Sequence, residues 1–190
     1  MPQPNGRRNT PRTCACFAGA LGLALVAGCA ATGRTGSAPR PVAPPTAREE
    51  AMFDALKALA GEWTMLDEHG QTVTGSVFAV SSNGNVVREV MFPGTDHEMT
   101  NVYHLDGPSL LVTHYCAMGN QPRMRATGPG PKDIDFRFDG VTNLASNQAY
   151  MGSLRLVVVD ADHIEQHWKS YKNGAELADH APVFQLTRKR

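Results

Sequence analysis

The chain has 190 residues, and its 18 basic and 18 acidic side chains give a formal net charge of zero. This length suits one domain with additional segments. The balanced charge provides neither the basic excess of a nucleic-acid-binding protein nor an acidic tail, so we expect no nucleic-acid partner.

The N-terminal residues are typical of an export signal. Residues 1–13 are polar and carry three arginines, and the apolar run CACFAGALGLALVAGCA follows them. A positive stretch before a short apolar run is the signature of a signal peptide. The run of about 14 residues is shorter than the roughly 20 that cross a bilayer. We therefore predict that residues 1–28 are a signal peptide.

The signal ends in Val26-Ala27-Gly28-Cys29, which resembles the lipobox of bacterial lipoproteins. The resemblance implies cleavage before Cys29, a diacylglyceryl group on its thiol and a further acyl chain on its freed amine. Each buried methylene contributes about 0.8 kcal/mol, so two or three chains anchor a protein stably. Ala30 stands where Asp would signal inner-membrane retention, which implies anchoring at the outer membrane, facing the periplasm. The mature chain would carry 15 basic and 18 acidic residues, a net charge of −3.

Two alternatives remain for the signal. It could be a plain secretory signal in which Cys29 is incidental, and the Arg7-Arg8 pair also suggests a twin-arginine signal, although the following NTPRT matches poorly. Another envelope membrane or secretion are the corresponding alternatives for location.

The cysteines and prolines define the next segment. Cys14 and Cys16 leave with the signal and Cys29 is acylated, so Cys116 is the one remaining thiol. This predicts no internal disulfide and excludes a zinc site built from several thiolates. Residues 29–45 contain the lipidated cysteine and four prolines, and they predict an extended tether.

A folded all-β domain is predicted over residues 46–190. Thr46 and Glu49 form a capping-box pattern, and apolar residues at helical spacing predict one short helix that ends at Gly61. About ten short strand-like runs follow, separated by turn signals such as Asn-Gly and Asp-Gly. Hairpin-linked strands in this number indicate an antiparallel up-and-down barrel, which removes its own edges.

Two stretches resemble known families. LAGEW at residues 59–63 resembles the Gly-x-Trp opening of the calycin group, which includes lipocalins, fatty-acid-binding proteins and nitrobindin-like haem barrels. The stretch from YHLDG through THYCAMGNQPRM is similar to uncharacterised bacterial lipocalin-like proteins, from which no catalytic residue carries over. Nitrobindin-like barrels hold haem through a histidine, and His114 and His180 are only loose candidates for it. We therefore expect no bound metal or haem, with haem as the less favoured alternative.

The turn at Asp106-Gly107 sets a register. It pairs Leu105 with Leu110, so that period-two alternation also pairs Tyr103 with Val112, Asn101 with His114 and Met99 with Cys116. This face is the more apolar one and is predicted to face the interior. The candidate ligand-binding residues on it are His97, Asn101, Tyr103 and His114.

Two arginines complete the candidate ligand-binding residues. The Asn83-Gly84 turn pairs Val80 with Val87 and Ala79 with Arg88. The side with the valines at 73, 77 and 90 is predicted to face inward, which would place Arg88 inside, where it needs a polar partner. We favour the alternative that Arg88 lies at the rim and reaches water. Arg123, beside the Gly119-Asn120 loop, is not explained by turn chemistry and is placed near the barrel mouth.

The other residues that suggest chemistry favour simpler interpretations. His163 and His167 lie about 13 Å apart on a strand, too far to share a zinc ion. With His69 and His104 they are predicted to be surface histidines. A reactive Cys116–His114 pair has no third orienting residue, so we favour Cys116 as a small buried apolar residue. Alternation in the later strands predicts that Ile134, Phe136, Phe138, Ile164 and Trp168 point inward.

Two functions follow from different classes. The first is a membrane-anchored, periplasm-facing lipoprotein whose barrel binds a small apolar or amphipathic ligand, with interior polar residues fixing its head group. The second is a structural or envelope-assembly lipoprotein whose barrel is filled by its own side chains. No constellation supports an enzyme, and the sequence leaves the ligand, protein partners and oligomeric state open.

Overall fold

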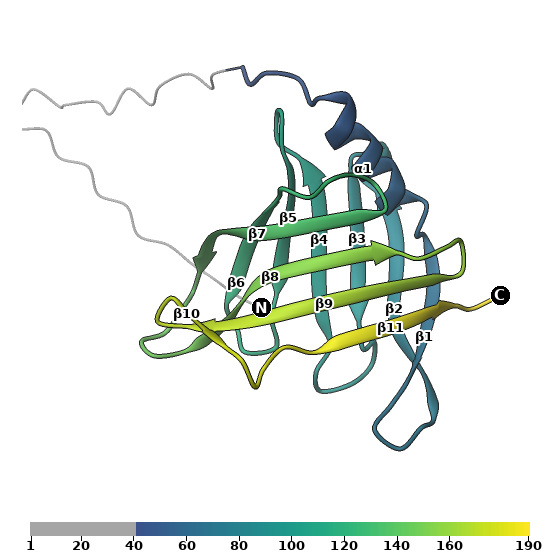
Figure 1. The fold of residues 1–190 in the computed structure, drawn as a ribbon, viewed down its shortest axis with the longest axis vertical. Coiled ribbons are helices and arrows are strands. Elements are labelled where there is room, and N and C mark those ends of the chain that lie inside the picture. The colour runs from purple at the N-terminus through teal and green to yellow at the C-terminus, as the bar shows by residue number, and fades with distance from the viewer. Residues whose placement is uncertain (1–40) are drawn as a thin grey trace, which may run out of the picture. The chain divides into compact units, whose positions relative to one another are not determined.

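The computed structural model describes residues 41–190, which contain one α-helix and eleven β-strands (Figure 1). The predictions for the signal peptide, for Cys29 and for the tether up to residue 40 lie outside the described residues. The elements are α1 (Ala47–Lys57), β1 (Gly61–Leu66), β2 (Thr72–Ser81), β3 (Val86–Met91), β4 (Met99–Leu105), β5 (Leu110–Tyr115), β6 (Gln121–Ala126), β7 (Asp133–Thr142), β8 (Ala149–Val158), β9 (His163–Lys172), β10 (Ala175–Leu177) and β11 (Val183–Arg188).

The strands form one closed antiparallel barrel. Neighbours along the chain pair from β1 to β9, β11 lies between β9 and β1, and the pairing of β8 with β9 completes a ring of ten strands. The short β10 pairs with β9 on the same side as β11. The predicted all-β barrel with one N-terminal helix is confirmed. Its pairings and core lie within residues 46–190, so this piece carries what a barrel needs to fold on its own.

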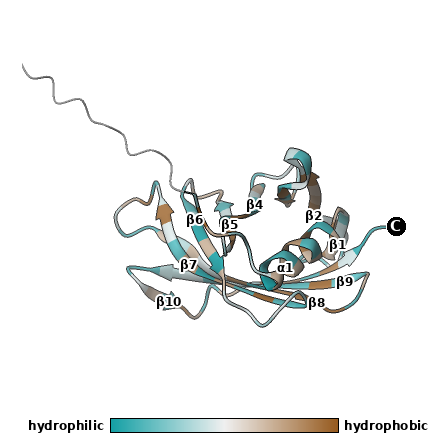
Figure 2. Ribbon diagram, turned by 90° about the horizontal axis from the view of Figure 1, so that it is seen from above, coloured by the Kyte–Doolittle hydropathy of each residue, from teal (hydrophilic) through white to brown (hydrophobic). Residues whose placement is uncertain are grey.

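The helix α1 covers one end of the barrel, beside the turn between β4 and β5 (Figure 2). It buries Met52, Phe53 and Leu56 in the core. Thr46 is the N-cap residue, and its hydroxyl donates to the Glu49 carboxylate. The helix ends at Lys57, earlier than predicted, because Gly61 with a φ of 129° already begins β1.

Trp63 and Arg188 tie the first strand to the last. The indole nitrogen of Trp63 donates to the Leu59 carbonyl at 2.8 Å, and the Arg188 guanidinium lies 4.3 Å from the ring centroid. The same guanidinium donates to the carbonyls of Ala58 and Ala60, both at 2.9 Å. A cation–π contact combined with hydrogen bonds to the residues after α1 holds the helix end of the barrel closed.

The β2–β3 hairpin keeps its predicted register but faces the other way. Val80 pairs with Val87 and Ala79 with Arg88, as expected. The side chains that enter the barrel are nevertheless those of the opposite face, including Phe78 and Glu89. The prediction that the valine-rich face points inward is wrong, because the inner face carries a charge whose hydrogen bonds are supplied by other strands.

The later strands follow their predicted alternation with one exception. Ile134, Phe136, Ile164 and Trp168 are all buried, whereas Phe138 is 46% exposed and lies 5.0 Å from the Tyr150 ring. Phe138 still pairs with Met124, and the register of β6 with β7 shifts directly after it, at Asp139, so the exception lies at the end of the regular pairing.

Candidate functional site

The barrel contains a cavity of about 370 Å³ at the end away from α1. This volume lies in the range of small-molecule sites, which runs from about 300 to 1,000 Å³. The lining is mostly apolar and rich in sulfur. It comprises Met91, His97, Met99, His114, Cys116, Ala117, Met118, Ala149, Met151, Trp168, Ser170, His180, Pro182 and Phe184.

Period-two alternation along the strands explains where the cavity lies. On β3 the inward residues are Val87, Glu89 and Met91, going from the α1 end toward the cavity. On β4 the order from the same end is Tyr103, Asn101 and Met99. The interior is therefore layered, with an apolar core under α1, a polar layer in the middle, and the cavity beyond it.

Glu89 is the centre of the polar layer. Its side chain is 0% exposed, yet it has four hydrogen-bond donors from three other strands. The Ser76 hydroxyl and the Gln166 amide donate to Oε1 at 2.7 and 2.6 Å. The Asn101 amide and the Tyr103 hydroxyl donate to Oε2, both at 2.7 Å. Among the described residues no cation pairs with Glu89, so these four neutral donors offset the cost of burying the carboxylate.

Tyr103 lies on the core side of this layer, next to the Glu89 carboxylate. Burial, and secondly the charge of Glu89, raise the pKa of the Tyr103 hydroxyl well above its ordinary value. The hydroxyl therefore stays protonated and serves as a donor at neutral pH.

One arm of the network runs from Glu89 to His114 and fixes the state of that histidine. Asn101 turns its amide nitrogen toward Glu89, so its oxygen faces His114 Nδ1 at 2.8 Å. An amide oxygen only accepts hydrogen bonds, so Nδ1 must carry the hydrogen. Burial lowers the pKa of His114 to about 4, which keeps the ring neutral at pH 7. Nε2 is then a bare lone pair.

Nε2 of His114 has no hydrogen-bond partner within the described part of the chain. The side chain is only 1% exposed, and the residue lines the cavity. A buried polar atom without a partner costs about 1–3 kcal/mol, so native proteins usually satisfy it with protein, water or a ligand. This acceptor is therefore the strongest sign of a binding site in the barrel.

The second arm runs from Glu89 to Trp168. Gln166 donates to Glu89 through its amide nitrogen, and its oxygen accepts from the Trp168 indole at 3.2 Å. The rings of Trp168 and His114 meet with centroids 4.9 Å apart. The two arms thus meet where these two rings are in contact. The buried Glu89 carboxylate orients both rings of the cavity lining through the hydrogen bonds of Asn101 and Gln166.

The predicted register of β4 with β5 is confirmed. Leu105 pairs with Leu110, Tyr103 with Val112 and Asn101 with His114. Asn101, Tyr103 and His114 are buried inside the barrel, as the register requires. His97 lies elsewhere: it is exposed in the β3–β4 loop and lines the mouth of the cavity. A ligand-binding role for these residues stays a prediction.

The two predicted arginines do not lie in the cavity. Arg88 is exposed, because it lies on the outer face of the β2–β3 hairpin. Arg123 lies in β6 and donates to Asp139 Oδ2 at 2.9 Å on the exposed side of the sheet. Both corrections have the same physical reason, since an arginine on the outer face keeps its hydration and needs no buried partner.

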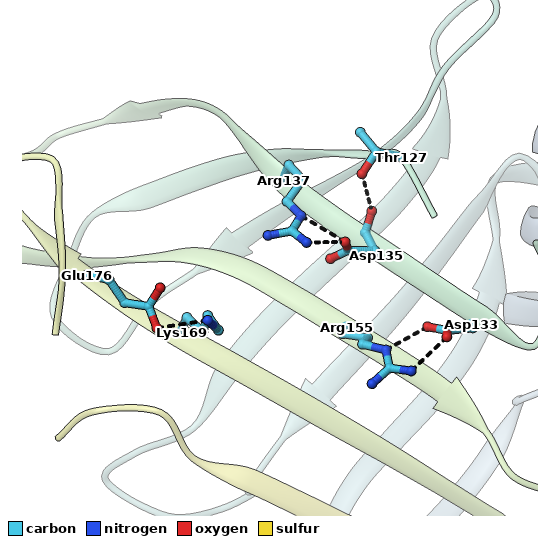
Figure 3. A network of polar contacts seen from close by, with 7 residues as sticks. All are labelled: Thr127, Asp133, Asp135, Arg137, Arg155, Lys169 and Glu176. Atoms are coloured by element: carbon cyan, nitrogen blue, oxygen red, sulfur yellow. Dashed lines mark hydrogen bonds and ion pairs between the residues drawn. The ribbon is translucent and has the colours of Figure 1, made fainter. Parts of the chain in front are cut away.

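The outer face of β7, β8 and β9 carries a mixed set of ion pairs (Figure 3). Arg155 binds both carboxylate oxygens of Asp133 at 2.8 Å, and Arg137 pairs with Asp135. Exposed pairs of this kind contribute about 0–1 kcal/mol each. They mark this face as solvated and leave the interior of the barrel as the place for a site.

Cys116 and the remaining histidines show no reactive arrangement. Cys116 is half-buried at the cavity wall rather than fully buried, and burial raises the pKa of its thiol. The His114 ring bonds Asn101 and not this thiol. His163 and His167 lie on the outer face and bond Asp160 and Glu165.

Two further kinds of feature are absent from residues 41–190. This range contains no group of three or more His, Cys, Asp or Glu side chains arranged to hold a metal ion. Nor does it contain a helix with the length and apolarity to cross a membrane.

Glu89 is the residue that sequence reasoning missed. It pairs with Asn101 across β3 and β4, and Val87 pairs with Tyr103. Placing Glu89 opposite Asn101 requires the register of β3 with β4, which the long loop between these strands does not set. The adjacent Arg88-Glu89 dipeptide was a signal, because one of two neighbouring charges on a strand between paired strands must face inward.

Comparisons with known proteins leave the site to be interpreted from its geometry. No protein-family model matches the chain, and no curated protein matches it.

Proposed function

We propose that the protein is a membrane-anchored, periplasm-facing lipoprotein whose barrel binds a small apolar or amphipathic molecule. The observation that carries the binding part of the proposal is the cavity of about 370 Å³, whose lining includes His114 with its buried, unpartnered acceptor Nε2. The Val26-Ala27-Gly28-Cys29 pattern supports the anchor.

The layered interior favours binding over a purely structural role. A barrel that only held its own shape would be most stable if its side chains filled the interior to native packing density. Here the half under α1 is filled, and the other half ends in methionine, aromatic and histidine side chains around a hollow. Methionine suits such a lining because its flexible thioether adapts to ligands of irregular shape.

A neutral fluorescent probe tests the binding part directly. N-phenyl-1-naphthylamine is apolar, carries one N–H donor and fluoresces when it leaves water. We expect the barrel domain, residues 41–190, to bind it and native mass spectrometry of freshly isolated protein to reveal a retained small molecule.

Two alanines provide a matched pair of variants for this test. Ala149 lines the cavity, whereas Ala161 is exposed in the turn between β8 and β9 at the other end. Ala149→Phe should fill the cavity and abolish probe binding, and Ala161→Phe should leave it unchanged. A wild-type domain that neither binds the probe nor retains a molecule would contradict the proposal.

A further inference from the structure

The polar groups of the cavity lining are few, and they restrict the chemistry of a ligand. None of the lining residues is Lys, Arg, Asp or Glu. Ser170 is the lining hydroxyl, and it donates to the Met151 thioether at 3.2 Å. His97 and His180 are exposed at the mouth. Among the side chains of the lining, the buried polar atom without a hydrogen-bond partner is therefore His114 Nε2, which accepts and does not donate.

We infer that the ligand of this cavity is an uncharged amphipathic molecule that enters polar end first and donates one hydroxyl or N–H hydrogen to His114 Nε2. This inference rests on the proposed function and specifies its ligand class. It commits to an alcohol, phenol or weakly basic amine and excludes carboxylate and phosphate head groups from the inner end of the cavity.

The exclusion of anions follows from the charges around His114. An anionic head group would lose its water without meeting a cation, since the lining offers no lysine or arginine. It would also face the bare lone pair of Nε2, behind which Asn101 connects to the Glu89 carboxylate. Both effects oppose a negative charge, and the lone pair favours a donor.

The tautomer of His114 cannot adapt to an acceptor ligand at low cost. Presenting a hydrogen at Nε2 of the neutral ring would require Nδ1 to lose its own hydrogen and face the Asn101 oxygen, two acceptors at 2.8 Å. Turning the Asn101 amide would in turn place its oxygen against Glu89. The Glu89 carboxylate thus determines which groups donate and which accept hydrogen bonds along this arm, and it makes His114 Nε2 an acceptor.

The size of the cavity limits the molecule as well. If each heavy atom occupies about the 30 Å³ that a water molecule takes in the liquid, roughly 12 heavy atoms fill the space inside the cavity. A larger molecule such as N-phenyl-1-naphthylamine then extends through the mouth, where His97 and His180 are exposed. Nonan-1-ol and methyl octyl ether fit this limit and form a matched pair, because they are isomers that differ in the hydroxyl hydrogen. Nonanoate provides the anion of similar length.

The experiment measures the affinities of these three compounds for residues 41–190 at pH 7.5 by displacement of N-phenyl-1-naphthylamine. We expect nonan-1-ol to bind about tenfold or more tightly than the ether, which corresponds to about 1.4 kcal/mol. Nonanoate should bind more weakly than the alcohol. In His114→Phe, which keeps a ring beside Trp168 and lacks the acceptor, the alcohol and the ether should bind equally. Ala161→Phe, at the other end of the barrel, should preserve the preference.

The outcomes separate the inference from the proposed function. Equal binding of alcohol and ether to the wild type would overturn the donor inference while leaving a ligand-binding barrel. Tightest binding by nonanoate would show that the polar end remains at the mouth near His97 and His180, and would also overturn it. Failure of all three compounds and of the probe would contradict both. If His114→Phe does not fold, the wild-type ratio of alcohol to ether decides alone.

Discussion

Glu89 and His114 lie on different strands and are joined by one side chain, Asn101, whose amide nitrogen is 2.7 Å from Glu89 Oε2 and whose oxygen is 2.8 Å from His114 Nδ1. The Glu89 carboxylate stays buried in the middle of the barrel. Through Asn101 it determines which nitrogen of the His114 ring carries the hydrogen. A hydrogen bond of this kind fixes the tautomer and the orientation of a histidine ring. The polar layer therefore separates the core from the cavity and sets the tautomer of His114 in the cavity lining.

Removing the carboxylate tests the importance of this layer for stability. Glu89→Ala leaves four buried donors without an acceptor, at about 1–3 kcal/mol each before water enters. We expect a loss of at least about 3 kcal/mol in the free energy of unfolding, measured in urea by tryptophan fluorescence. Arg88→Ala, one residue earlier and exposed, is the matched control and should change stability by less than about 0.5 kcal/mol. Equal stabilities of the two variants would show that the network is dispensable.

The His114 ring predicts a specific dependence on pH. Its pKa in the folded protein is about 4, below the ordinary 6.5, because burial disfavours the charged form. The unfolded chain then binds more protons between these pH values, so stability falls as the pH is lowered from 6.5 toward 4. The contribution approaches about 3 kcal/mol at the lower limit.

A difference between variants isolates that contribution. In His114→Phe this loss is absent, so the stability gap between wild type and variant should move in favour of the variant as the pH falls from 7 to 4. His69→Gln, which alters an exposed histidine, should not change the slope. A gap that is independent of pH would mean that His114 is not buried as a neutral ring.

Cys116 should react slowly in the folded domain. It is half-buried, burial raises the pKa of its thiol, and only the thiolate reacts. In residues 41–190 it is the sole cysteine of the sequence, so alkylation at pH 7.5 reports it directly. We expect slow modification of the folded domain, fast modification in denaturant, and further slowing by bound N-phenyl-1-naphthylamine. Rapid modification of the folded domain would restore the reactive interpretation.

The lipid anchor depends on one residue. Metabolic labelling with a fatty-acid analogue should tag the full chain and leave it in the membrane fraction. Cys29→Ala should lose the tag and release the protein, because the thiol that accepts the diacylglyceryl group is gone. Cys116→Ala is the control and should be labelled like the wild type. Labelling of Cys29→Ala at the wild-type level would contradict the lipoprotein assignment.

The sequence predicted those parts of the structure that local patterns determine. The Asp106-Gly107 turn and period-two alternation were enough to place Asn101 opposite His114 inside the barrel. The β2–β3 hairpin has an equally clear turn, yet its faces were inverted. Its valine-rich face points outward. The inner face includes Glu89, whose carboxylate accepts a hydrogen bond from Gln166, 77 residues away in the sequence. The Arg88-Glu89 pair indicates that one charge faces inward, but no local pattern shows which one or which distant side chains bind it. The cavity depends in the same way on how ten strands pack together.

The protonation state of the His114 ring tests the proposed binding site most directly. Long-range ¹⁵N–¹H correlation spectra of the labelled barrel domain distinguish the two neutral tautomers from the charged ring, and His114→Phe assigns the signal. We expect a neutral ring at pH 7 with the hydrogen on Nδ1, and a change at Nε2 when nonan-1-ol is added. A hydrogen on Nε2, a charged ring, or an Nε2 signal that is unchanged at saturating nonan-1-ol would contradict the proposed binding site.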